Sequence, residues 1–104
     1  MKRHREFQYI YKKGKSAHAN SCVLFYLSHN EKKVGFTATK KVGNAVVRNR
    51  CKRRLRALFL EFSDSIKEGT YIFVAKGSTH TINFSALETD FRKILKKSGA
   101  LLEN

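Results

Sequence analysis

Proline is absent from this sequence, and cysteine occurs only twice, at Cys22 and Cys51. The absence of proline, together with only six glycines, argues against linkers between domains. We therefore expect one domain over residues 1–104, large enough for a modest core. The two cysteines match neither a metal-ligand spacing nor a disulfide framework. Cys51 falls on the apolar face of a predicted helix, which indicates a buried, reduced thiol.

Long apolar runs are also missing. No segment approaches the roughly 18 apolar residues that a membrane helix needs, and no signal-peptide pattern is present. We therefore expect a cytoplasmic protein without membrane contact.

Acidic residues are scarce, with eight Asp and Glu against 22 Lys and Arg, a net charge of +14. Residues 1–56 contain 16 of the basic residues and only two acidic ones, whereas residues 57–104 contain six of each. A hydrophobic content of 41% excludes a disordered basic tail. A folded domain with its positive charge on one part of the chain is typical of nucleic-acid binding.

The segment 40–56, KKVGNAVVRNRCKRRLR, carries eight basic residues and no acidic one. Asn44 is a good N-cap, and from there to residue 62 apolar residues recur every three or four positions, which predicts a helix over 44–62 with one packed face. Arg48, Lys52 and Arg56 form a stripe beside that face, and Arg50 and Arg54 flank the other side. An ordinary solvated helix face mixes charges of both signs, so we favour contact with a polyanion over simple solvation.

The remaining patterns predict an α+β sandwich in the order α-β-β-α-β-α. They indicate a short helix over 4–12, strands over 21–28 and 34–39 joined by a hairpin at 29–33, and a central strand over 70–75. A last helix is expected to start at a capping box formed by Ser85 and Glu88.

No arrangement of catalytic residues is visible in this chain. The four histidines stand far apart without ligand or acid–base spacing, and we expect them on the surface. No nucleophile elbow, carboxylate pair or phosphate-binding glycine loop occurs. The sequence therefore predicts no catalytic residue and no metal ligand in the protein.

The run from Lys40 to Arg53 closely resembles the signature of the bacterial ribonuclease P protein subunit. The opening residues 7–14, FQYIYKKG, are similar to the first-helix pattern of that family. Val34-Gly35-Phe36, followed by the lysine pair, resembles its second strand. The resemblance covers nearly the whole chain.

This resemblance implies an accessory subunit of a ribonucleoprotein endoribonuclease, with a compact α/β sandwich and a left-handed βαβ crossover. It implies that the RNA subunit, with Mg²⁺, removes the 5′ leader of precursor tRNA, while the protein binds the catalytic RNA and the leader and needs no protein partner. The residues that match the RNA-binding signature are Lys40, Lys41, Asn44, Arg48, Asn49, Arg50, Lys52, Arg53 and Arg56. Those that match positions in the leader cleft are Phe7, Tyr11 and Phe25, although their spacing alone would favour ordinary core.

Three other functions are weaker interpretations of this sequence. A structural or chaperone RNA-binding module would have the same composition, but its affinity would not depend on a leader. A DNA-binding module lacks a second helix at helix-turn-helix spacing. A protein nuclease acting alone lacks acid–base residues in a recognisable arrangement.

Overall fold

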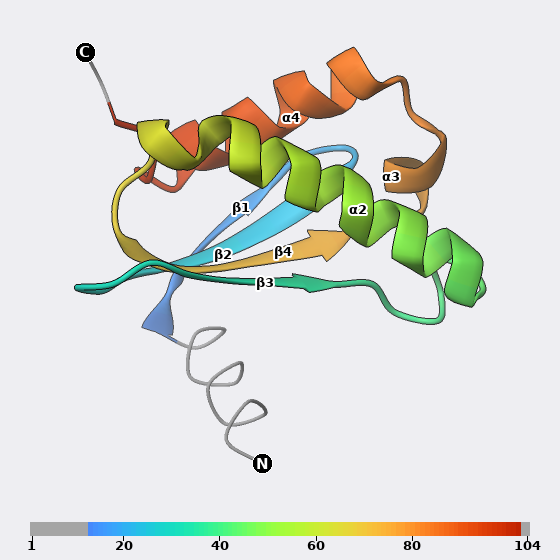
Figure 1. Cartoon of the computed structure of the whole chain (residues 1–104), viewed down its shortest axis with the longest axis horizontal. Helices are drawn as coiled ribbons and strands as arrows, with labels where there is room; N and C mark the ends of the chain where they lie inside the picture. The colour runs from blue at the N-terminus through green and yellow to red at the C-terminus, as the bar shows by residue number, and fades with distance from the viewer. Residues whose placement is uncertain (1–12, 103–104) are drawn as a thin grey trace.

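A computed structural model of the chain describes residues 13–102. One four-stranded sheet carries helices on one face (Figure 1). The strands are β1 (Lys15–His18), β2 (Cys22–Ser28), β3 (Lys33–Thr37) and β4 (Gly69–Ala75). The helical elements are α2 (Ala45–Phe62), the 3₁₀ turn η1 (Ser63–Ser65), α3 (Gly77–Thr81) and α4 (Phe84–Lys97). This arrangement confirms the predicted α+β class, whereas the helix predicted over 4–12 lies outside the described residues.

The sheet has the order β1-β2-β4-β3. β4 pairs antiparallel with β2 and parallel with β3, which confirms it as a central strand. The expected hairpin between the strands near 21–28 and 34–39 is wrong, because β4 lies between them. β4 is apolar on both faces and suits the middle of the sheet. β3 exposes Lys33 and Val34, which suits an edge strand.

Helix α2 connects the parallel neighbours β3 and β4, as such strands require. The resemblance implies a left-handed crossover here, and that handedness stays a prediction. The side-chain oxygen of Asn44 caps the helix by accepting a hydrogen bond of 3.0 Å from the Val47 amide. The apolar face predicted from the sequence is confirmed, because Cys51, Leu55 and Leu58 are fully buried.

Helix α4 begins two residues earlier than its predicted capping box. Its N-cap is Asn83, whose side-chain oxygen accepts a hydrogen bond of 2.8 Å from the Ser85 amide. Ser85 therefore lies inside the first turn, and the capping-box prediction with Glu88 is wrong. The buried face is as predicted, and the Phe91 ring stacks on Phe73 of β4 with 4.6 Å between ring centroids.

Two short elements were not predicted from the sequence. In β1 only Ala17 is buried, so the strand shows too little alternation to be recognised. Helix α3 has five residues, too few for a periodic pattern. With β1 and α3 included, the described order is β-β-β-α-β-α-α, apart from η1.

Candidate nucleic-acid interface

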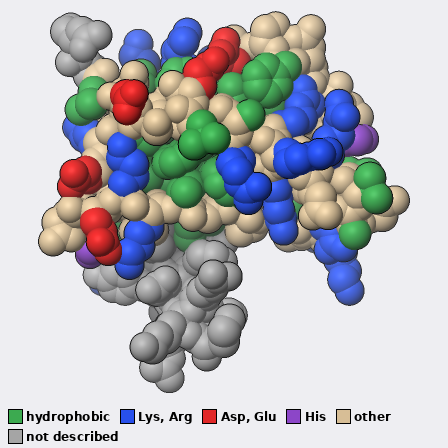
Figure 2. All heavy atoms as spheres, in the orientation of Figure 1, with side chains coloured by type: hydrophobic (Ala, Val, Ile, Leu, Met, Phe, Trp, Pro, Cys, Tyr) green, Lys and Arg blue, Asp and Glu red, His purple; other side chains and the backbone are tan. Residues whose placement is uncertain are grey.

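The outward surface of α2 is strongly basic. Arg50, Arg53 and Arg56 are exposed, as are Lys40 and Lys41 in the turn before the helix. Figure 2 shows Lys and Arg side chains gathered over the part of this face where α2 begins, while the acidic side chains lie toward the left and top. The charges on this face are therefore separated by sign rather than mixed.

The start of α2 adds to this positive potential. Its first turn contains no acidic residue, although Asp and Glu are the residues that usually compensate the positive end of a helix dipole. The amide groups and dipole at a helix start attract anions such as phosphate. The local sequence thus places a second positive contribution beside the arginines.

A surface hollow of about 500 Å³ lies on the outer side of α2. It brings together four residues of the predicted RNA-binding set, and they are Asn49, Lys52, Arg53 and Arg56. Val46 also lines the hollow and is 77% exposed. The sequence analysis missed Val46, although a valine outside the apolar stripe of the helix was an available signal. Cations, an amide and an apolar surface together suit a nucleotide, which has a phosphate, a base edge and an apolar base face.

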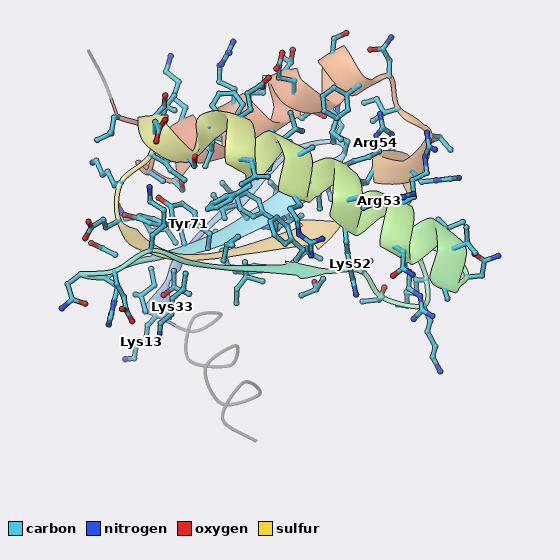
Figure 3. All side chains as sticks on the ribbon, viewed as in Figure 1. Lys13, Lys33, Lys52, Arg53, Arg54 and Tyr71 are labelled. Atoms are coloured by element: carbon cyan, nitrogen blue, oxygen red, sulfur yellow. The ribbon has the colours of Figure 1, made fainter. Side chains whose placement is uncertain are left out.

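Arg54 belongs to the same basic run but points into the fold. Its guanidinium donates hydrogen bonds to three carbonyl oxygens, those of Thr79 at 2.6 Å, His80 at 3.0 Å and Ile82 at 2.6 Å. It also lies over the Phe84 ring, 5.6 Å from the centroid. Figure 3 shows Arg54 on the side of α2 that faces α3, and Lys52 on a different side. Burial and the nearby charge of Arg50 lower the pKa of Arg54.

Arg56 and Arg48 occupy intermediate situations. The Arg56 guanidinium lies 5.4 Å from the centroid of the Phe36 ring, a cation–π contact that orients the side chain while leaving the residue exposed. Arg48 is half-buried. The basic run therefore divides by position on the helix into exposed cations, half-buried ones and the inward-pointing Arg54.

Phe25 of β2 lies on the sheet face opposite the main core cluster. It is half-buried and pairs across the sheet with Ser16 of β1 and Ile72 of β4. Its neighbours on this face, Val23 and Ile72, are buried and apolar. Phe7 and Tyr11 lie outside the described residues, so the predicted leader cleft is represented here by Phe25 alone.

Comparison with known proteins identifies the family. The family model described as Ribonuclease P matches residues 1–99. A ribonuclease P protein component from a Nitratiruptor species is 43% identical over 97 residues, covering 93% of this chain and 89% of the relative. One from Streptococcus agalactiae is 32% identical, covering 97% and 94% of the two chains. The chain belongs to the ribonuclease P protein family.

Solved structures of ribonuclease P proteins agree with this assignment. The RNase P protein of Staphylococcus aureus superposes with a TM-score of 0.84 at 27% identity, covering 97% of this chain and 95% of that one. As a ribonuclease P protein component, this chain is an accessory subunit of an endoribonuclease of tRNA 5′ processing. The family predicted from the signature run is therefore confirmed.

Within this ribonuclease P protein, neither thiol is suited to nucleophilic chemistry. Burial raises the pKa of the Cys22 thiol to about 12, and burial also raises the pKa of Cys51. Both cysteines are fully buried, which confirms the expectation for Cys51. No group of three or more His, Cys, Asp or Glu side chains that could hold a metal ion occurs among residues 13–102.

The histidines and the helices complete the description. His18 and His29 are exposed and His80 is half-buried, while His4 is not among the described residues. Over the described part of the chain, no helix has the length and apolar character needed to cross a membrane.

Proposed function

We propose that this protein binds the catalytic RNA of ribonuclease P and the single-stranded 5′ leader of precursor tRNA, and so promotes endonucleolytic maturation of the tRNA 5′ end. The observation that carries the proposal is the hollow on α2, where Lys52, Arg53 and Arg56 surround Asn49 beside a helix start that has no acidic residue. A site of this composition suits the phosphates of a structured RNA.

Electrostatics makes the first contribution to this function. Catalytic RNA and precursor tRNA are both polyanions and repel each other. A protein with a net charge of +14 lowers this repulsion and replaces condensed counterions at each phosphate it contacts. The effect does not depend on base sequence, as a subunit that serves many precursor tRNAs requires.

The second contribution is selectivity for precursor over mature tRNA. A leader base stacked on Phe25 would be available only before cleavage. Stacking of a base on an aromatic side chain contributes about 1–3 kcal/mol and tolerates any base. Since about 1.4 kcal/mol changes an affinity tenfold, one stacked base would favour precursor over product.

In this proposal the RNA subunit performs the phosphodiester hydrolysis with Mg²⁺ that it binds itself. The protein supplies charge and shape, contributes no metal ligand and needs no protein partner. The compartment we propose is the cytoplasm, where tRNA precursors and their processing RNA would meet.

The deciding experiment is cleavage of a precursor tRNA by a bacterial ribonuclease P RNA at low, near-physiological Mg²⁺, with and without this protein. We expect leader removal that requires both components and none with the protein alone. Cleavage by the protein alone would reveal an active site in the protein. Tight RNA binding without stimulation would instead indicate a structural RNA-binding module.

A further inference from the structure

The turn between β1 and β2 is held by side chains from α4 and from the segment that starts α3. Four consecutive carbonyl oxygens, those of residues 18–21, each accept one side-chain hydrogen bond. In chain order the donors are Lys97 Nζ at 3.2 Å, Lys76 Nζ at 2.7 Å, Ser78 Oγ at 3.0 Å and Thr79 Oγ1. Because two of the four donors are ammonium groups, the fold itself places two positive charges at this turn.

A polar hollow of about 260 Å³ opens beside the turn. Lys76 and Lys97 line it together with Lys93 of α4 and the exposed His18. The hollow also contains one carboxylate, Asp90, which is 8% exposed and accepts a hydrogen bond of 2.6 Å from Ser21 Oγ. Three lysines against one aspartate leave the hollow positively charged.

These lysines have no carboxylate partner of their own. Among residues 13–102, the ion pair within 4 Å is Lys33 with Glu31, on the far side of the sheet order from this turn. A lysine ammonium has three donors, and one on Lys76 and one on Lys97 are used by the turn. The remaining donors suit an oxyanion, and part of the side-chain entropy that binding would cost is already lost on folding.

The hollow lies at one end of the sheet face that carries Phe25. His18 pairs directly with Val23 across β1 and β2, and Val23 is two residues from Phe25 on the same strand. Alternate residues of a strand share a face, so His18, Val23 and Phe25 lie on one face, with backbone positions 18 and 25 roughly 8 Å apart. A single-stranded RNA stacked on Phe25 could therefore place a neighbouring phosphate at the hollow.

We infer that the hollow at Lys76, Lys93 and Lys97 is a phosphate site for the 5′ leader, adjacent to the base that stacks on Phe25. This inference rests on the proposed function and adds a second leader contact to it. Lys76 and Lys97 are positioned by the carbonyl groups of Ala19 and His18. Lys93, which is exposed, adds the third charge from the neighbouring turn of α4.

The test uses the assembled holoenzyme and two double variants of α4 that carry equal charge. Lys93→Gln with Lys97→Gln changes the hollow, and the glutamine amide can still donate to the His18 carbonyl. Arg92→Gln with Lys96→Gln is the control, since these exposed residues have the same spacing on the same helix but do not line the hollow. Affinity is measured for precursor tRNA with a long leader, for precursor tRNA with a single leader nucleotide and for mature tRNA.

For the hollow variant we expect about fourfold weaker binding of the long-leader precursor at about 0.15 M salt for each contact removed, with a salt slope lower by about 0.7 per contact. The short-leader and mature tRNAs should bind as they do to the control. An equal loss in the control variant, or an equal loss for all three RNAs, would assign the charge to general attraction or to the catalytic RNA and overturn the inference. Unchanged long-leader affinity would also overturn it.

A failed proposed function would look different. If the unmodified protein does not stimulate cleavage by the catalytic RNA, the proposed function itself falls. If stimulation is present and Phe25→Leu removes the leader-dependent affinity while the hollow variant retains it, only the phosphate site falls.

Discussion

Arg54 of α2 donates a hydrogen bond of 2.6 Å to the backbone carbonyl oxygen of Thr79, the last buried residue of α3. The same guanidinium binds the carbonyls of His80 and Ile82, so one side chain satisfies the C-terminal end of a five-residue helix and the connection to α4. α3 in turn holds the β1–β2 turn through Ser78 and Thr79. Arg54 therefore links the basic helix to the turn at the edge of the sheet.

Replacing Arg54 should reduce stability more than replacing its neighbour Arg53. Hydrogen bonds from a charged group contribute about 1.5–3 kcal/mol each, and leaving the carbonyls partly buried without a donor adds to the loss. We expect Arg54→Ala to lower the free energy of unfolding by about 2–3 kcal/mol in urea denaturation. The exposed Arg53→Ala should change it by less than about 0.5 kcal/mol. Equal effects of the two variants would show that the carbonyl contacts contribute nothing to stability.

RNA affinity should show the reverse order. Lys52→Ala with Arg53→Ala should weaken binding to the catalytic RNA and reduce the salt slope by about 0.7–0.9 per lost phosphate contact. Titrations over a range of salt concentrations measure this slope directly. Lys96→Ala, an exposed lysine at the end of α4, is the matched control. A salt slope that stays the same in the Lys52 and Arg53 variant would remove α2 from the interface.

The aromatic ring at position 25 should determine leader recognition. Phe25→Leu retains an apolar side chain but loses the stacking surface, so affinity for precursor tRNA should fall by about 1–3 kcal/mol with little change for mature tRNA. Phe25→Tyr keeps the ring and should bind like the unmodified protein. Binding of both RNAs to the two variants provides the comparison, and equal losses for precursor and mature tRNA would refute a leader role for Phe25.

Asn44 should contribute to stability as well as to RNA binding. It caps α2, so Asn44→Ala should cost about 1 kcal/mol of folding free energy, whereas the exposed Asn49→Ala should cost less than about 0.5 kcal/mol. Asn44→Asp keeps the capping oxygen and should preserve stability, but its negative charge should weaken RNA binding. Thermal denaturation and RNA titration of the three variants separate the two roles. A stable Asn44→Ala variant would contradict the capping role.

The raised pKa of Cys22 predicts slow thiol chemistry and a fall of stability at high pH. Its pKa is about 12 in the folded protein against 9.0 for the model thiol, so the unfolded chain loses the proton first as the pH rises. The contribution to stability is complete below about pH 9 and is lost as the pH rises toward 12. At pH 8, a disulfide reagent should modify Cys22 only after denaturation. Rapid reaction of the native protein would contradict this burial.

Helix α2 could be predicted almost to the residue because its signals are local. The cap at Asn44 and the apolar recurrence through Cys51 and Leu55 act within one or two turns. The strand partners could not be predicted in the same way. The pattern of residues 34–39 is compatible with pairing to β2 or to β4, and only the competition for a place beside the apolar β4 decides between them.

The sequence by itself determined the charged helix, its buried face and the membership of the family, because charge, periodicity and a long signature are properties of consecutive residues. Tertiary structure alone decided that Arg54 points inward while Arg53 points outward. It also decided that Lys76 and Lys97 meet at the carbonyl groups of residues 18–21. These contacts join residues more than 20 positions apart in the chain. Such contacts form only once the sheet and helices have packed, since hydrogen bonds to distant carbonyls leave no periodic signal in the sequence.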